Sequence, residues 1–230
     1  MRGLYAIVDV GTLAARRLDP VAFAAAVLRV RPAALQLRAK DYPPRETLAL
    51  LRELAPMCHR VGVPLVANDR PDLAILAGCD LVHIGQTDMP VDRVRRIAPG
   101  LRVGLSTHTL EQLDAALAAQ PAYVAFGPVF HTTTKLDPDP VVGVAGLRPA
   151  HARAAAAGVP LVAIGGITRD NAAELVGLVD AVAVVADLVP PTLVHGTAAP
   201  ASDVLREVTA RAQALHDLFA PPLPIAGAAR

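Results

Sequence analysis

The chain has 230 residues, 53% of them hydrophobic and 19% charged, with a formal net charge of +1. This composition predicts a folded, well-buried globule and excludes a disordered chain, and the near-neutral charge indicates neither a nucleic-acid nor a membrane-surface partner. No apolar run reaches the roughly 18 residues that a membrane span needs. With no signal-peptide pattern and only two cysteines, Cys58 and Cys79, we expect a cytoplasmic protein with two buried apolar thiols.

Short apolar runs alternate with segments of helical period along the whole chain. Strands are predicted at 4–8, 34–37, 64–67, 81–84, 102–105, 122–126, 160–164 and 181–185. Helices are predicted at 20–31, 44–60, 71–78, 90–98, 109–119, 147–157, 169–177 and 201–218. Eight of each favour a (β/α)8 barrel over a doubly wound open sheet, as a single domain spanning 1–218. The tail 219–230 is predicted to be disordered.

The segment 34–41, ALQLRAKD, carries two cations in and beside a predicted strand. Its two leucines lie on one face, so Gln36, Arg38 and Lys40 project from the opposite face. Burying an unpaired cation is costly, and such a strand therefore calls for an anion. Because the chemistry of such a barrel sits at the C-terminal ends of its strands, we expect Arg38 and Lys40 to face an anion there.

Two acidic residues follow neighbouring strands, Asp69 after 64–67 and Asp88 after 81–84. Mg²⁺ commonly takes one or two carboxylates, with phosphate oxygens and water completing its shell. Cations beside such a site would suit a pyrophosphate. Each acid also has a structural alternative, a helix N-cap for Asp69 and a turn or an N-cap for Asp88.

Later strand ends add hydroxyls, a lysine and a glycine pair. The connection 127–146, GPVFHTTTKLDPDPVVGVAG, is too long for an ordinary link, and its three threonines followed by Lys135 resemble an anion clamp. The segment 164–171, IGGITRDN, places two glycines before an expected helix start, so that its backbone N–H groups would seat a phosphate. A tight turn that requires glycine is the alternative there, and both roles are compatible. His83 is predicted to be a core histidine rather than a ligand.

Seven motifs in order resemble the thiamine-phosphate synthase family over about residues 4–187. They are LYAIVD, LQLRAKD, VPLVANDRPDLA, VHIGQTDMP, GLSTHTLEQ, YVAFGPVFHTTTK and VAIGGITRDN. The resemblance implies an enzyme that joins a hydroxymethylpyrimidine diphosphate to a thiazole phosphate, giving thiamine phosphate and pyrophosphate. It also implies Mg²⁺ and a dissociative mechanism, in which the bond to pyrophosphate breaks before the thiazole nitrogen attacks.

The resemblance further implies roles for individual residues. The pyrimidine diphosphate would contact Gln36, Arg38, Lys40, Asn68, Ser106 and Lys135, with Arg38, Lys40 and Lys135 as the catalytic cations. The thiazole phosphate would contact Thr132, Thr134, Gly165, Gly166, Val185 and Ala186. Mg²⁺ would be held by Asp69 and Asp88. The chain departs from the family at Ala186, where the family usually has serine, which removes one hydroxyl from the phosphate seat.

Other functions are compatible with the same barrel. A related thiazole tautomerase tends to lose the metal residues and to carry histidine where this chain has Pro128. A catalytically silent phosphate-ligand-binding barrel is suggested by Ala186 alone. A phosphosugar isomerase would leave the Gln-x-Arg-x-Lys strand unexplained. Barrels of this size often pair, so a homodimer is one option for the assembly.

Overall fold

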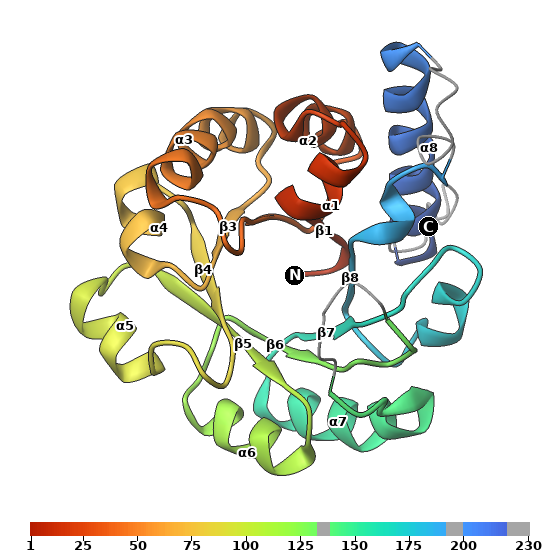
Figure 1. Cartoon of the computed structure of the whole chain (residues 1–230). Helices are drawn as coiled ribbons and strands as arrows, with labels where there is room; N and C mark the ends of the chain where they lie inside the picture. The colour runs from red at the N-terminus through yellow and green to blue at the C-terminus, as the bar shows by residue number, and fades with distance from the viewer. Residues whose placement is uncertain (133–138, 192–199, 220–230) are drawn as a thin grey trace, which may run out of the picture.

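The computed structural model describes residues 1–132, 139–191 and 200–219, and eight parallel strands within them close into a barrel (Figure 1). The strands are β1 (Gly3–Asp9), β2 (Ala34–Arg38), β3 (Leu65–Asn68), β4 (Leu81–Ile84), β5 (Arg102–Thr107), β6 (Tyr123–Phe126), β7 (Leu161–Ile164) and β8 (Ala181–Val184). They pair in chain order, and β8 returns to β1 with Ala181 opposite Gly3. The predicted (β/α)8 barrel is confirmed, and the open sheet is excluded.

Helices surround the barrel on the outside (Figure 1). They are α1 (Val10–Ala15), α2 (Pro20–Leu28), α3 (Pro44–Val61), α4 (Pro71–Ala77), α5 (Val91–Ile97), α6 (Leu110–Ala118), α7 (Gly143–Ala157) and α8 (Ala201–Phe219), with the 3₁₀ turns η1 (Ala172–Leu175) and η2 (Ala186–Leu188). Gly62, Gly78 and Gly158 end α3, α4 and α7 in the left-handed conformation, which glycine adopts without steric cost. Phe219 is buried as the last residue of α8, whereas the tail predicted beyond it lies outside the described residues.

The hydrophobic core has two layers, because successive strand residues point to opposite sides of the barrel wall. The inner layer fills the barrel and includes Tyr5, Tyr123 and Val162. The outer layer lies between the strands and the helices and includes the two leucines of β2, Leu35 and Leu37. The opposite face of β2 therefore points into the barrel, as the sequence predicted.

The helix predicted at 169–177 is wrong, because the structure has only the four-residue turn η1 there. The side chain of Asn171 explains the difference. Its Oδ1 accepts from the Thr168 backbone N–H at 2.8 Å, and its Nδ2 donates to the Gly166 carbonyl at 3.0 Å. These side-chain bonds use backbone groups at the point where a helix would have to begin.

One connection is shorter than predicted, and one helix was not predicted at all. The long connection 127–146 is shorter than expected, since α7 already begins at Gly143. The short helix α1 was not predicted, and it is capped by Asp9, whose carboxylate accepts from the Thr12 backbone N–H. That cap places the Asp9 carboxylate at the C-terminal end of β1, on the side where the other strands also end.

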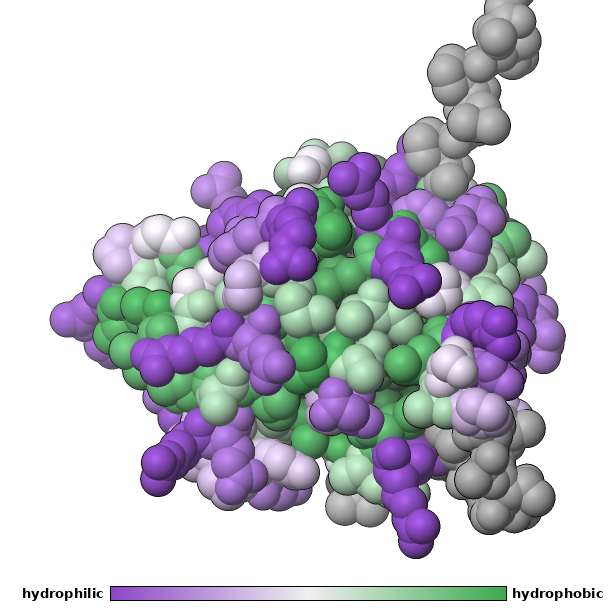
Figure 2. Space-filling model, turned by 90° about the horizontal axis from the view of Figure 1, so that it is seen from above, coloured by the Kyte–Doolittle hydropathy of each residue, from purple (hydrophilic) through white to green (hydrophobic). Residues whose placement is uncertain are grey.

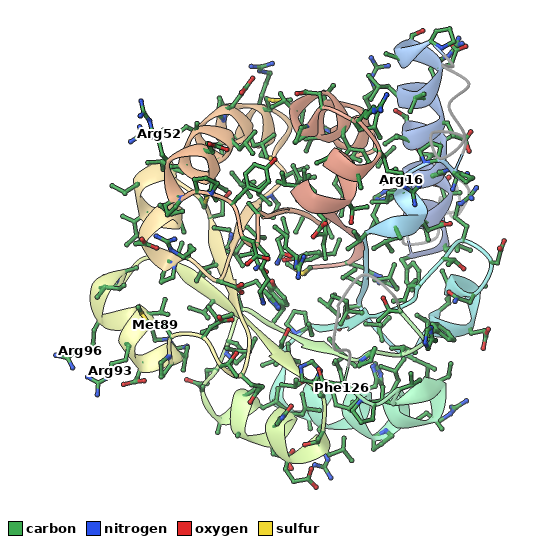
Figure 3. The ribbon with its side chains drawn as sticks, in the orientation of Figure 1. Arg16, Arg52, Met89, Arg93, Arg96 and Phe126 are labelled. Carbon is green, nitrogen blue, oxygen red and sulfur yellow. The ribbon has the colours of Figure 1, made fainter. Side chains whose placement is uncertain are left out.

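The outer surface mixes hydrophilic side chains with exposed apolar ones, as Figure 2 shows for one flank of the barrel. Arg52, Arg93 and Arg96 point away from the barrel into solvent, whereas Phe126 is buried in the outer core (Figure 3). Among the described residues, no helix is both long and apolar enough to cross a membrane.

Candidate active site at the C-terminal ends of the strands

A cavity of about 550 Å³ opens at the C-terminal ends of the strands, the end at which barrels of this type carry their chemistry. All twelve of the described residues predicted for the site line this cavity. They are Gln36, Arg38, Lys40, Asn68, Asp69, Asp88, Ser106, Thr132, Gly165, Gly166, Val185 and Ala186. The other two, Thr134 and Lys135, lie outside the described residues. The structure thus brings the predicted residues together, while their individual roles stay predictions.

Arg38, the last residue of β2, and Lys40, two residues beyond it, both line this cavity. Arg38 donates from Nη1 to the Asp9 carboxylate at 2.5 Å, and the Asp9 side chain is only 6% exposed. The register explains the pair, because Asp9 and Arg38 are partners across the β1–β2 ladder. Part of the anionic charge that β2 requires therefore comes from the protein itself, which the sequence analysis missed.

The two predicted metal ligands lie side by side. Burial, together with the neighbouring Asp88 carboxyl, raises the pKa of Asp69 from 3.8 to about 6, although Lys40 and Arg38 act in the opposite direction. Asp69 has a positive φ of 61° and does not cap α4, whose N-cap is Arg70. The N-cap alternative for Asp69 is therefore wrong. Asp88 does hold a turn, since its Oδ2 accepts from the Gly85 backbone N–H at 2.7 Å.

The acidic pair fits a divalent cation. Two adjacent carboxylates repel each other in a partly buried position, and a cation between their oxygens would remove that repulsion. No cluster of three or more His, Cys, Asp or Glu side chains arranged to hold a metal occurs in the part of the chain that the structure describes. A donor set of two carboxylates suits Mg²⁺, which fills its remaining positions with water and phosphate oxygens.

The glycine pair after β7 is fixed by close packing. Gly165 and Gly166 have φ values of 98° and 65°, and a Cβ on Gly166 would lie 2.3 Å from the His131 carbonyl oxygen. The backbone after β6 runs directly against them, with the Phe130 N–H donating to the Gly165 carbonyl at 3.0 Å. The predicted tight turn is confirmed, whereas the helix expected behind it to strengthen a phosphate seat is not there.

A partly buried ion cluster lies on the same side of the cavity. Asp187 lies next to Ala186, and its side chain is 13% exposed. It accepts from both the backbone N–H and Nε of Arg169, at 3.0 and 2.9 Å, and Arg211 of α8 reaches it at 3.7 Å. These contacts tie the loop after β7 to the loop after β8, and the sequence analysis did not single them out.

His83 is a buried core residue, as predicted, and it also reaches the cavity. Its Nε2 lies 2.8 Å from Ser106 Oγ, and its Nδ1 lies 2.8 Å from the hydroxyl of Tyr123. Burial lowers the pKa of His83 from 6.5 to about 4, so its ring is neutral at pH 7.

Of the two cysteines, Cys58 is buried as expected and Cys79 is only half-buried.

His108 connects the loop after β5 with the segment after β6. Its Nδ1 lies 2.6 Å from the Gly127 carbonyl, and its Nε2 lies 3.4 Å from Asp139. Both partners line the cavity. No signal in the sequence distinguished His108, because its partners are a backbone oxygen and a residue that lies beyond the next strand, β6.

Comparisons with known proteins agree on one family. The model of the family described as thiamine monophosphate synthase matches residues 4–188. The thiamine-phosphate synthase of Roseiflexus castenholzii is 42% identical over 177 residues, which is 76% of this chain and 75% of that protein. The enzyme of that name from Koribacter versatilis is 46% identical over 156 residues, 67% of this chain and 72% of that protein.

A solved structure extends the similarity to the three-dimensional fold. The thiamine phosphate pyrophosphorylase of Pyrococcus furiosus superposes with a TM-score of 0.75 at 30% identity, covering 94% of both chains. Phosphoribosyl anthranilate isomerase of Thermotoga maritima, at 16% identity and a TM-score of 0.60, shares the barrel fold alone.

Proposed function

The chain belongs to the thiamine monophosphate synthase family and is a transferase of thiamine biosynthesis, and we propose that its cavity joins a hydroxymethylpyrimidine diphosphate to a thiazole phosphate. The products are thiamine phosphate and pyrophosphate. The observation that carries this proposal is the gathering of twelve described residues, named by the family resemblance, around one cavity of about 550 Å³.

Arg38 of β2 and Lys40 just after it suit a reaction in which a diphosphate leaves. Negative charge grows on the leaving group as the C–O bond breaks, and positive groups fixed beside it stabilise that state more than the ground state. Arg38 and Lys40 supply this charge at the end of β2. The ion pair with Asp9 holds the Arg38 guanidinium in place before the substrate arrives, so that less ordering is needed on binding.

We propose Mg²⁺ as the cofactor, held by Asp69 and Asp88. When bound there, the ion would act as a Lewis acid that neutralises charge on the departing diphosphate. The raised pKa of Asp69 supports this assignment, because the two acids are held together at an electrostatic cost that a bound cation would relieve.

The opposite side of the cavity suits the thiazole phosphate. Gly165 and Gly166 line the cavity without side chains of their own, and Val185 and Ala186 line the same cavity. The thiazole nitrogen would attack the pyrimidine methylene carbon after the diphosphate has left, so no protein nucleophile is required. Thr132 and Thr134 complete the proposed contacts to the thiazole phosphate, and Lys135 completes those to the pyrimidine diphosphate.

The two related alternatives are less well supported. A thiazole tautomerase has no use for paired carboxylates beside two cations, and Pro128 lines the cavity where such enzymes tend to carry histidine. A silent phosphate binder rests on Ala186 alone, and removing that one hydroxyl leaves the backbone and all the charged groups of the site in place.

The decisive experiment is formation of thiamine phosphate from the two phosphorylated halves, with and without Mg²⁺. Product that appears only with Mg²⁺ would establish both the reaction and the metal requirement. Product formed equally well in a chelator would refute the metal assignment. Binding of thiazole phosphate without any product would favour the silent binder.

We also propose that the enzyme works in the cytoplasm, where both phosphorylated substrates would be retained. The two thiols, Cys58 and Cys79, are free, which is the state that a reducing compartment maintains.

A further inference from the structure

A continuous row of hydrogen bonds crosses the barrel beneath the cavity. Gln36 Nε2 lies 3.0 Å from the Tyr5 hydroxyl, the Tyr5 and Tyr123 hydroxyls are 2.7 Å apart, and His83 bonds to Tyr123 on one side and to Ser106 on the other, at 2.8 Å each. We call these five residues the floor network. Its two ends, Gln36 and Ser106, line the cavity, and both are predicted to contact the pyrimidine substrate.

The barrel is built to accommodate this network. Gly104 of β5 lies between His83 of β4 and Tyr123 of β6 in the same row of the sheet. A Cβ on Gly104 would lie 2.1 Å from Cζ of the Tyr123 ring. The missing side chain lets the Tyr123 ring lie across β5 and stack on His83, with ring centroids 5.6 Å apart and planes inclined by 9°.

Because Nε2 of Gln36 faces the Tyr5 hydroxyl, the burial of Tyr5 and Tyr123 sets the direction in which both tyrosines donate. The Tyr5 oxygen accepts from the Gln36 amide, and its own buried proton is satisfied only by Tyr123, because a buried donor without an acceptor is costly. Tyr123 then accepts from Tyr5 and donates to Nδ1 of His83. A neutral ring that accepts at Nδ1 carries its proton on Nε2, and that proton is donated to Ser106 Oγ.

We propose that the floor network sets the hydrogen-bonding polarity of the substrate site, so that Ser106 presents a proton and Gln36 presents a carbonyl oxygen to the aminopyrimidine diphosphate. Ser106 accepts from His83, which leaves its own hydroxyl proton for an acceptor atom of the substrate. Gln36 donates from its amide to Tyr5, which leaves its carbonyl to accept from an amino group. Tyr5, Tyr123 and His83 are then positioning residues. This inference rests on the proposed function.

The first test measures the tautomer of His83 in ligand-free enzyme by nitrogen NMR of labelled histidine, with His83→Gln used for assignment. We expect a neutral ring protonated on Nε2 at pH 7. Tyr123→Phe removes the donor to Nδ1 and should abolish this tautomer preference, whereas Tyr42→Phe, the same change at an exposed tyrosine, should leave it intact. A ring protonated on Nδ1 in the unaltered enzyme would overturn the proposal.

The second test is a double-mutant cycle on kcat/KM for the pyrimidine substrate. Tyr123→Phe should lower kcat/KM about tenfold or more, because a small misplacement of groups that position a substrate can cost about 100-fold. In an enzyme that already carries Ser106→Ala, the same change should cost less than about twofold, because Tyr123 acts through Ser106. Equal costs in both backgrounds would overturn the proposal.

A replacement variant and a measurement without substrate keep both tests interpretable. If Tyr123→Phe fails to fold, Tyr5→Phe replaces it, and its effect should then depend on whether Gln36 is intact or changed to Ala. The tautomer measurement needs no substrate. An enzyme that makes no thiamine phosphate but shows the Nε2 tautomer would therefore refute the proposed function and not the polarity of the network.

Discussion

On the β2–β4 side of the cavity the proposed functional groups are charged side chains, whereas on the β7–β8 side they are a glycine pair and the residues that follow β8. Arg38, Lys40, Asp69 and Asp88 create local charge, and each is individually replaceable by a residue of the same shape. The proposed phosphate seat at Gly165 and Gly166 depends on the course of the main chain, which no side chain can restore. Substitutions on the first side should therefore change chemistry at nearly constant structure, and substitutions on the second should change both.

The largest effect is expected for the two proposed metal ligands. Asp69→Asn and Asp88→Asn should each lower kcat about 100-fold or more, since a metal ion at a developing charge contributes several kcal/mol. Asparagine tolerates the positive φ of Asp69 and can still accept the turn bond of Asp88. Asp72→Asn, in an exposed pair with Arg70, is the matched control and should retain activity. Full activity in both site variants would refute the assignment.

Asp69→Asn should also make the metal-free protein more stable at pH 7. The folded-state pKa of Asp69 is about 6 against 3.8 for an ordinary aspartate, so the folded protein holds this proton more tightly than the unfolded chain does. Stability therefore falls as pH rises from about 4 to 6, and the loss is complete at pH 7. Asp69→Asn should raise Tm at pH 7 and should leave Tm unchanged below pH 4. A lower Tm at pH 7 would contradict this.

The next largest effect tests the backbone side. Gly166→Ala combines a positive φ with a Cβ placed 2.3 Å from a carbonyl oxygen, so we expect both a lower Tm and a KM for thiazole phosphate raised about tenfold. Gly177→Ala has a similar φ of 81° with nothing within 4 Å of the new Cβ. It should cost roughly 1 kcal/mol of stability and leave KM unchanged. Equal KM values in the two variants would remove the phosphate seat from this turn.

A smaller effect is expected at Asp9. Asp9→Asn preserves the cap of α1 but removes the negative charge that holds Arg38, and we expect kcat/KM for the pyrimidine diphosphate to fall about tenfold. Arg70→Gln, which breaks an exposed pair, should have no such effect. If Asp9→Asn instead improved binding of the diphosphate, Asp9 would be a competitor for Arg38 rather than its support.

The smallest effect is expected at the departure from the family. Ala186→Ser restores a hydroxyl beside the phosphate seat, and one added hydrogen bond of about 1 kcal/mol would lower KM for thiazole phosphate about fivefold. Turnover should not change, because the charged side of the cavity is untouched. Steady-state kinetics with each substrate varied in turn would separate the two. A changed kcat with constant KM would argue against a phosphate contact at this position.

The contrast between the two sides also explains what could be predicted from the sequence. Arg38, Asp69 and Asp88 were identifiable because charged residues at the ends of apolar strands are unusual, and their chemistry follows from residue type. The helix at 169–177 was wrong because Asn171 bonds the local backbone, a competition that periodicity does not register. Neither Asp9 as partner of Arg38 nor Tyr123 as neighbour of His83 follows from spacing, since both depend on the register of strands.

The closure of the barrel has a consequence for synthesis of the chain. β1 has two partners, β2 near it in sequence and β8 close to the other end of the described chain, and α8 also contacts β1. During translation, one edge of β1 has no partner until β8 has left the ribosome, and an open strand edge invites pairing with another chain. Nascent barrels truncated before residue 181 should therefore associate through β1, and a chain that includes β8 protects that edge.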